Sequence, residues 1–310
     1  MDILQAIVYG VVEGATEFIP VSSTAHIYLV PYVFGWEKPA TEFTAIIQLG
    51  AIIAVVLYFW KDLSGAAVAW VRSFMGGPKD TVEVKTGWAV VIATAIISIV
   101  GLALHNYIEG PFRSLWVIGS SLIIMGLIMV FAEKRATLSR GADSVSNRDG
   151  VLIGLWQCIA LIPGMSRSGS TISGALLDGF DRTSAARLSF LMSVPAIALA
   201  GAYEGVKEIK HLKEANLVAP TFVATIASFV VGYACIRWLM GFIQRRGVVP
   251  FVGYRIALGI FVLFMCGTGR WDPNPESKLT NTAPSEVASN TELPTPNFHR
   301  NVSQKVASSR

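Results

Sequence analysis

Two glutamates and a histidine stand in the otherwise apolar first part of the chain, within EGATEFIPVSSTAH at 13–26. Glu13 and Glu17 are four residues apart, so a helix would place both carboxylates on one face. Carboxylates that close repel each other unless a cation or a shared proton intervenes. Mg²⁺ and Ca²⁺ prefer oxygen ligands, so the pair predicts a divalent-cation or acid–base site. A plainer alternative, in which the glutamates pair with a buried Lys or Arg, stays open.

The residues after the second glutamate predict a break in the helix and a new helix start. Pro20 cannot continue the helical hydrogen-bond ladder, and Ser22, Ser23 and Thr24 are residue types that cap a helix. The N-terminus of a half-helix presents free N–H groups and a positive dipole end, which together bind anions. His26 follows within the next turn. Beside two carboxylates and a run of hydroxyls, we expect it to act in proton transfer rather than in packing.

A second polar cluster, PGMSRSGST at 163–171, lies in another apolar region. Arg167 offers the planar cationic fork that suits bidentate phosphate binding. Gly164 and Gly169 let the backbone approach a ligand closely. The cluster also supplies hydroxyls, from Ser166, Ser168, Ser170 and Thr171. A role for Arg167 that is limited to neutralising the glutamates stays open beside phosphate binding.

The two clusters together describe a pocket inside the membrane for a phosphorylated group. One contributes carboxylates, hydroxyls and an imidazole, and the other contributes a guanidinium, glycines and hydroxyls. Ionisable residues within membrane segments are costly and are functional by default. A phosphate site at membrane depth predicts a lipid phosphate as substrate, with a metal ion as a further partner.

The composition indicates an all-α polytopic integral membrane protein. Hydrophobic residues make up 53% of the 310 residues, charged residues only 15%, and the mean hydropathy is +0.54. Soluble domains carry about 25% charged residues. About six apolar windows are long enough to cross a hydrocarbon core of roughly 30 Å. They lie at 42–60, 86–106, 114–132, 184–203, 217–239 and 251–269.

Two further apolar stretches, 1–35 and 150–179, are interrupted by the polar clusters. Non-helical backbone at membrane depth is tolerated only inside protein or beside water, so each stretch predicts a re-entrant hairpin of two half-helices. Both run in the same order, with an apolar helix, Ile-Pro, a Ser/Thr cluster and another apolar helix. Paired broken helices predict two structural repeats with a site at their interface. In the first stretch, Gly10 and Gly14 form a GxxxG pattern that permits close helix packing.

The predicted organisation is one membrane domain followed by a polar tail. The tail has few large apolar residues and predicts disorder. The boundaries are 1–270 for the membrane domain, about 1–132 and about 150–269 for its repeats, and 271–310 for the tail.

Lys and Arg residues in the short loops predict how the chain crosses the membrane. On the side taken as cytoplasmic they number ten, within 61–85, 133–149 and 240–250. On the opposite side they number five, within 36–41, 107–113 and 204–216. This excess follows the positive-inside rule and makes the two repeats inverted, with hairpins that enter from opposite sides. Because loops account for the basic residues, the pI near 9.0 gives no sign of nucleic-acid binding.

At these residues the chain resembles a known family. EGATEFIPVSSTAH is similar to the EGxTEFLPVSSTGH signature of the undecaprenyl-diphosphate phosphatases, also called the bacitracin-resistance family, and PGMSRSGST matches their second signature, PGxSRSG(A/S)T. The FxxxIQLG-like stretch from Phe43 to Gly50 also agrees, and the resemblance covers roughly 1–270. Ile19 and Ala25 stand where the signature has Leu and Gly, so a backbone angle open only to glycine is not expected at Ala25.

The resemblance implies a multi-pass protein of the bacterial plasma (inner) membrane whose site faces the periplasm or outer face. It implies hydrolysis of undecaprenyl diphosphate to undecaprenyl phosphate and inorganic phosphate. That reaction recycles the lipid carrier for peptidoglycan and other envelope polymers and confers bacitracin resistance. It also implies a divalent cation, Mg²⁺ or Ca²⁺, which Glu13 and Glu17 would hold. By motif position the functional residues are Glu13, Glu17, Ser23, His26, Ser166, Arg167 and Thr171, to which we add Ser22, Thr24 and Ser168 as substrate-binding hydroxyls.

The nucleophile stays open at this point. We favour Ser23 with acid–base support from His26, and the alternatives are a phosphorylated His26 or direct attack by water. A transporter or lipid flippase is the rival class, because inverted repeats with broken helices are typical of transporters. The carboxylates, imidazole and hydroxyl around Arg167 exceed what anion binding alone requires. A phosphatidic-acid-phosphatase type is disfavoured because its Lys-x6-Arg-Pro signature is absent, and homo-oligomerisation is left undecided.

Overall fold

The structure is a computed structural model, and it describes residues 1–108, 111–214 and 217–274. Regular structure in these ranges is helical, with one isolated bridge between Arg140 and Phe180. The described residues to Pro273 form one compact unit. From residue 275 onward, the tail that is expected to be disordered lies outside the described residues.

The first half of the chain opens with a helical hairpin whose two arms pack against each other. Four helices of 15 to 22 residues and two short helical segments follow it. The elements are α1 (Ile3–Phe18), α2 (Ser23–Phe34), α3 (Thr41–Tyr58), α4 (Trp60–Phe74), α5 (Val82–Ala103), α6 (His105–Ile108), η1 (Pro111–Arg113) and α7 (Leu115–Arg135).

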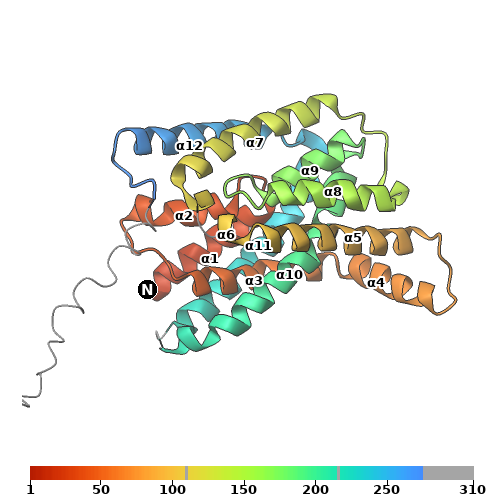
Figure 1. The fold of residues 1–310 in the computed structure, drawn as a ribbon, viewed down its shortest axis with the longest axis horizontal. Coiled ribbons are helices and arrows are strands. Elements are labelled where there is room, and N and C mark those ends of the chain that lie inside the picture. The colour runs from red at the N-terminus through yellow and green to blue at the C-terminus, as the bar shows by residue number, and fades with distance from the viewer. Residues whose placement is uncertain (109–110, 215–216, 275–310) are drawn as a thin grey trace, which may run out of the picture. The chain divides into compact units, whose positions relative to one another are not determined.

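The second half repeats this plan, with a second hairpin and then three long helices. Its elements are η2 (Ala142–Ser144), α8 (Asn147–Ile159), α9 (Arg167–Leu177), α10 (Arg182–Glu214), α11 (Val218–Arg246) and α12 (Val249–Gly267). Figure 1 shows the first hairpin toward the left end of the view and the second toward the right. Both stretches that the sequence predicts as broken are therefore pairs of half-helices.

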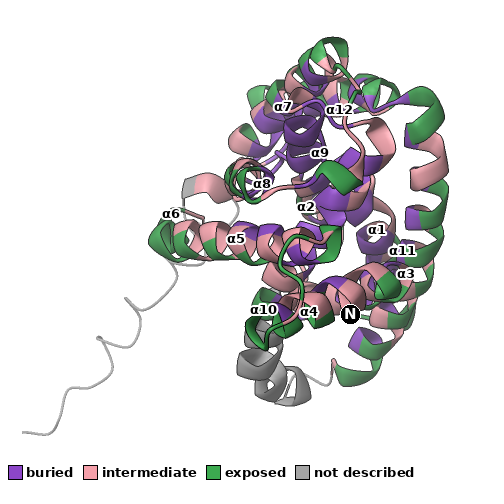
Figure 2. Cartoon of the chain, turned by 90° about the vertical axis from the view of Figure 1, so that its right-hand side faces the viewer, coloured by how far each residue is buried: buried purple, intermediate pink, exposed green. Residues whose placement is uncertain are grey.

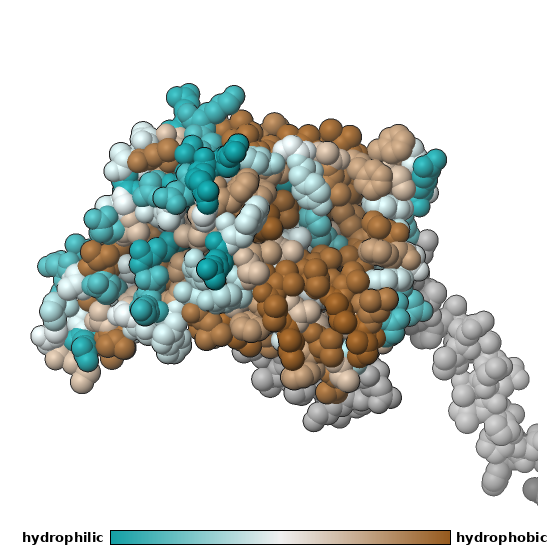
Figure 3. Space-filling view, turned by 180° about the vertical axis from the view of Figure 1, so that it is seen from behind, coloured by the Kyte–Doolittle hydropathy of each residue, from teal (hydrophilic) through white to brown (hydrophobic). Residues whose placement is uncertain are grey.

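Five described helices are long and apolar enough to cross a membrane, namely α5, α7, α10 up to Gly201, α11 and α12. The pair α3 and α4, which bends by 77° at Phe59, gives a sixth if the two helices are counted as one broken span. The prediction of an all-α polytopic protein with about six spans is therefore confirmed. Figure 3 shows a broad hydrophobic face with hydrophilic side chains gathered toward one end of the long axis. Large apolar side chains such as Ile99, Leu102 and Phe222 point outward, as lipid contact requires.

Two segments that were expected to be loops contain helix. The segment 61–85 holds most of α4, and α10 continues through 204–214. In α4, Lys61 and Asp62 in the first turn and Arg72 in the last give a polar helix that no run of about 20 apolar residues would flag.

The two halves of the chain are interlocked. α1 packs chiefly on α11 and α8 packs on α5, while α7 pairs with α12 and α3 pairs with α10. The first arm of each hairpin, α1 or α8, therefore lies against a helix from the other half of the chain. Gly10 and Gly14 make the first of these contacts close, because a Cβ atom would stand 2.2 Å from the Ala224 carbonyl oxygen and 2.4 Å from that of Ser228, respectively.

The most deeply buried element is α9, and Figure 2 shows it in purple at the centre of the unit. Buried residues run almost without interruption from Ser168 to Leu176. Short side chains allow this close packing. At Gly174, for example, an added Cβ atom would stand only 2.2 Å from the Trp156 ring of α8. The two arms of the second hairpin therefore pack closely at Gly174.

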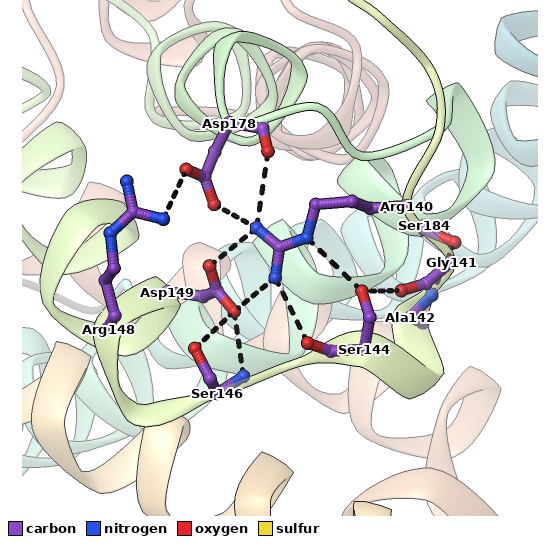
Figure 4. A network of polar contacts seen from close by, with 9 residues as sticks. All are labelled: Arg140, Gly141, Ala142, Ser144, Ser146, Arg148, Asp149, Asp178 and Ser184. Carbon is purple, nitrogen blue, oxygen red and sulfur yellow. Dashed lines mark hydrogen bonds and ion pairs between the residues drawn. The ribbon is translucent and has the colours of Figure 1, made fainter.

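A polar network fixes the base of that hairpin (Figure 4). Arg140 donates to both carboxylate oxygens of Asp149, over 2.9 and 2.8 Å, and also pairs with Asp178. Arg148 reaches the other Asp178 oxygen at 3.1 Å. Burial raises the pKa of Asp149, but the hydrogen bonds it accepts, chiefly from Arg140, outweigh this and lower it to about 2. The network thus joins the first turn of α8 to the C-terminal end of α9.

Candidate active site

The break in the first hairpin turns the chain at the Ile-Pro pair. α1 ends at Phe18, and α2 begins at Ser23. Ser22 is the cap residue of α2, and its hydroxyl accepts a hydrogen bond from the Ala25 N–H at 3.3 Å. Its φ is +77°, which is uncommon for a residue with a side chain. The N-terminus of α2 is thereby held at the tip of the hairpin.

The break in the second hairpin has the same construction. α8 ends at Ile159, and α9 begins at Arg167. Ser166 caps α9 by accepting from the Gly169 N–H at 3.2 Å, and its φ is +70°. Gly164 has a φ of +93°, and a Cβ there would stand 2.6 Å from the Ile118 carbonyl oxygen. Both hairpins therefore present a serine-capped helix start, which is an anion-binding feature.

Glu17 lies where the two hairpins meet and accepts three hydrogen bonds. Oε1 accepts from Arg167 Nη2 at 2.9 Å and from Gln48 Nε2 at 3.2 Å. Oε2 accepts from Ser23 Oγ at 2.5 Å. One carboxylate thus links the second hairpin, α3 and the start of α2. The ion pair with Arg167 is the neutralising arrangement that the sequence leaves open.

Arg167 also has a donor nitrogen that the ion pair with Glu17 does not use. Its Nη1 is buried and has no hydrogen-bond partner among the described residues. An unpaired guanidinium N–H away from water is costly, and an oxyanion placed beside it would remove that cost. The ion pair with Glu17 therefore leaves half of the guanidinium fork available for a phosphate oxygen.

Glu13 lies one helical turn before Glu17 and is 5% exposed. No hydrogen bond or ion pair from the described side chains reaches it. The nearby hydroxyl of Tyr9, on the same face of α1, also lacks a partner there. The Glu13 carboxylate is thus an uncommitted oxygen ligand inside the protein.

His26 is held from two sides. Its Nδ1 lies 2.7 Å from the Ser22 carbonyl oxygen, which can only accept, so Nδ1 carries the proton. Nε2 then accepts from the Tyr254 hydroxyl at 2.6 Å, and the two rings stack with centroids 5.6 Å apart. In this state His26 bonds to Tyr254, whereas Ser23 bonds to Glu17. The structure therefore offers Ser23 a carboxylate as proton acceptor, in place of the imidazole support that the sequence suggested.

The remaining predicted hydroxyls are largely committed to the helix starts. Ser168 Oγ lies 3.3 Å from Ser166 Oγ, and Thr171 Oγ1 donates to the Arg167 carbonyl at 2.8 Å. Thr171 also bonds to Ser189 of α10. Thr24 is exposed, on the outer side of the first turn of α2. The structure thus brings Glu13, Glu17, Ser23 and Arg167 together, and it gives the other hydroxyls mainly structural contacts.

Three residues near the site were not assigned to it from the sequence: Gln48, Tyr254 and Arg255. Gln48 lies in the FxxxIQLG-like stretch from Phe43 to Gly50, which was given no role in the site. Arg255 carried a usable signal, because a charged residue inside the apolar window 251–269 is a functional candidate by default. Tyr254 gave no such signal, since aromatic residues are common in membrane helices.

Fold and site together define a polytopic membrane protein in which two broken-helix hairpins bring Glu17, Ser23 and Arg167 together. The chain belongs to the family of the bacitracin resistance protein BacA, whose family model matches residues 6–261. A similar protein from Myxococcus xanthus, named undecaprenyl-diphosphatase, is 44% identical over 88% of this chain and 92% of its own length. One from Nocardioides with the same name is 43% identical over 87% of this chain and 98% of its own length. An undecaprenyl-diphosphatase 2 from Streptomyces avermitilis is 40% identical over 88% of this chain and 98% of its own length.

Proposed function

We propose that this protein removes the terminal phosphate of undecaprenyl diphosphate, giving undecaprenyl phosphate and inorganic phosphate. The single observation that carries the proposal is the buried, unpartnered Nη1 of Arg167 beside Glu17 and Ser23. Two serine-capped helix starts converge on the same place, and the names of the similar proteins agree with this chemistry. Arg167 and the helix N–H groups would bind the phosphate oxygens and offset charge in the transition state.

Ser23 is the nucleophile that the hydrogen bonds favour. Its Oγ–H donates to Glu17, so Glu17 can take the proton as Ser23 Oγ bonds to the terminal phosphorus. The bond from that phosphorus to the bridging oxygen breaks, and undecaprenyl phosphate leaves. Water then attacks the phosphoserine, Glu17 returns a proton to Ser23, and inorganic phosphate is released. Attack by water without a covalent step, or by His26, would use the same phosphate cradle.

Glu13 fits the role of a ligand for a divalent cation. A hard cation such as Mg²⁺ is commonly bound by one or two carboxylates, with water and substrate phosphates completing its shell. Glu13 is uncommitted, and Glu17 lies one turn away on the same helix face. Described residues hold no cluster of three or more acidic, His or Cys ligands, so the donor set fits a cation shared with the substrate better than a closed protein site. Such a cation would supply charge stabilisation to the phosphoryl oxygens.

The first test is phosphate release from undecaprenyl diphosphate by the purified protein in detergent, with and without EDTA. We expect Arg167→Ala, which removes a transition-state donor, and Glu17→Gln, which removes the proton acceptor of Ser23, each to lower the rate at least about a hundredfold. Matched controls are Glu133→Gln and Arg182→Ala. Each breaks the ion pair between Arg182 Nε and Glu133 Oε1, which are 2.5 Å apart and belong to neither hairpin. The controls should keep activity in their folded fraction.

Acid quenching with labelled terminal phosphate identifies the nucleophile. Label on Ser23 that disappears in Ser23→Ala supports the serine route. Label that is retained by Ser23→Ala and lost in His26→Ala assigns the step to His26. An unlabelled protein with an active Ser23→Ala variant assigns attack to water. Ser173→Ala, at a buried serine of α9, is a suitable control.

A transporter is the second candidate, and the observation that favours it is the pair of inverted broken-helix hairpins. Folded protein that binds the lipid but releases no phosphate under any metal condition would make transport the leading account. Reconstitution into vesicles with substrate on one side distinguishes the two activities directly.

In the cell, the proposal places the protein in the bacterial plasma membrane with its site facing the outer side. It would then regenerate undecaprenyl phosphate for peptidoglycan synthesis and lower sensitivity to bacitracin. Expression of the wild-type chain, but not of Arg167→Ala, should restore growth in a bacterium depleted of this activity and raise its tolerance to bacitracin. Accessibility of an engineered cysteine at Thr24 to an impermeant thiol reagent reports which side the site faces.

A further inference from the structure

Arg255 of α12 is a buried cation that the reaction outlined above does not use. It is 0% exposed, and no carboxylate pairs with it among the described residues. A charged group at membrane depth is costly without partners. Its retention in this position therefore requires other contacts that favour the charge.

The partners of Arg255 are main-chain carbonyls. Nη1 donates to Pro20 at 3.0 Å, and Nη2 donates to Gly164 at 2.9 Å and to Met165 at 3.1 Å. Nε donates to Leu122 of α7 at 3.3 Å. One guanidinium thus reaches the break of the first hairpin, the break of the second hairpin and α7 at once. Backbone groups freed by a broken helix need such partners inside a membrane protein.

The carbonyls of the two breaks lie one or two residues before the cap residues. Pro20 stands two residues before Ser22, and Met165 stands immediately before Ser166. Both serines have positive φ, a conformation that persists only where the surroundings enforce it. Arg255 bonds to the backbone on the near side of each break, and on the far side the half-helices begin at Ser23 and Arg167. Its contacts therefore fix the place from which both reactive side chains extend.

We propose that Arg255 is a positioning residue that holds the two helix starts in register during phosphate transfer. The inference rests on the proposed function. At rest, the hairpins also meet in the Arg167–Glu17 ion pair. When Glu17 takes the proton of Ser23 it loses its negative charge, so that ion pair weakens when it is needed most. The Arg255 bonds end on carbonyls, which a phosphate does not displace, and they keep Ser23 and Arg167 together when the ion pair opens.

The geometry requires an arginine in particular. A guanidinium has five donors in a rigid plane, whereas a lysine ammonium is a single point charge on a flexible stem. Lysine at this position would keep the charge but could not bond to both breaks and α7 in the same geometry. A role in charge alone would be met by lysine, so Arg255→Lys separates positioning from charge.

The kinetic test compares Arg255→Met and Arg255→Lys with the wild type. The matched control is Arg237→Met, at an exposed arginine of the neighbouring span α11. We expect kcat per folded protein to fall about a hundredfold in Arg255→Met, since displacement by about 1 Å costs that much, and to fall less in Arg255→Lys. KM for the lipid should change less than kcat, because Arg255 bonds to main-chain carbonyls and does not itself contact the substrate. A folded Arg255→Met protein with wild-type kcat would overturn the inference. So would an Arg255→Lys protein that has both wild-type kcat and wild-type rates of backbone hydrogen–deuterium exchange.

Hydrogen–deuterium exchange supplies a readout that is independent of turnover. Both Arg255 variants should exchange faster at 19–25 and at 160–169 together, by about tenfold or more, while the core of α7 keeps its wild-type rate. If only one break loosens, or neither does, Arg255 does not couple the hairpins and the inference fails. If Arg255→Met does not fold, Arg255→Lys provides both readouts. A wild type that releases no phosphate would contradict the proposed function, while the exchange data would still decide the coupling.

Discussion

Replacement of Gly14 by alanine tests whether the close contact of α1 with α11 positions the carboxylates. A Cβ at Gly14 would stand 2.4 Å from the Ser228 carbonyl oxygen and 2.9 Å from the Gly232 amide nitrogen. Ordinary contact begins near 3.4 Å, so the helices must separate by about 1 Å. The contacts are backbone atoms, which cannot rotate away as a flexible side chain can.

The expected loss of stability combines two opposing effects. Overpacking costs about 1–3 kcal/mol, while alanine in a helix interior gains about 1 kcal/mol over glycine. We therefore expect Gly14→Ala to lower the free energy of unfolding by roughly 1–2 kcal/mol. The effect on activity should be larger, because the same helix carries Glu13 and Glu17. A displacement of about 1 Å at such groups can cost a hundredfold in rate.

Gly65→Ala is the matched control, because a methyl group added to this helical glycine of α4 would have no heavy atom within 4 Å. The free energy of unfolding of Gly65→Ala should rise by up to about 1 kcal/mol, because alanine favours the helix more than glycine does, and activity should stay at the wild-type level. Thermal unfolding and phosphate release in detergent, normalised to folded protein, measure both quantities. The reasoning is refuted if Gly14→Ala matches Gly65→Ala in both, since the contact would then yield without moving the carboxylates.

Asp149→Ala should lower stability by about 1.5–3 kcal/mol, because Arg140 loses two charge-assisted hydrogen bonds but keeps its ion pair with Asp178; a chemical-denaturation midpoint equal to that of the wild type would contradict this. Tyr254→Phe removes the hydroxyl that bonds to His26 Nε2, so kcat should fall severalfold if that bond orients the ring, and an unchanged pH–rate profile would argue against any role. Ser173→Ala removes a buried hydroxyl that has no partner among the described residues, so it should leave stability unchanged or raise it by about 1 kcal/mol, as thermal unfolding would measure.

Local sequence signals were sufficient for the hairpins and the spans. Pro20 and the Ser22 cap lie two residues apart, and the proline of the second break lies three residues before Ser166, so the chemistry of each break can be read from a few residues. Long apolar windows likewise marked the spanning helices. The exception is α4, whose charged first and last turns hid its helical character.

Contacts between distant residues were out of reach of the sequence. Gly10 and Gly14 predicted a close helix neighbour, but not that the neighbour is α11 of the other repeat. His26 was expected to assist Ser23, yet its Nε2 is taken by Tyr254, 228 residues away. The acceptor for Ser23 is Glu17, six residues earlier, and that pairing depends on how sharply the hairpin turns. The catalytic roles of these residues stay predictions until they are measured.

The two breaks explain why the site needs both repeats. Ser22 and Ser166 are equivalent caps with nearly equal φ, but the next residue is a nucleophile candidate, Ser23, in one hairpin and a cation, Arg167, in the other. Glu17 has no counterpart carboxylate in the second hairpin, where Cys158, Ala160 and Leu161 precede the Ile-Pro pair. The Arg167–Glu17 ion pair holds the cationic hairpin against the acidic one. Since each hairpin also packs on a helix of the other repeat, neither half can assemble a phosphate cradle by itself.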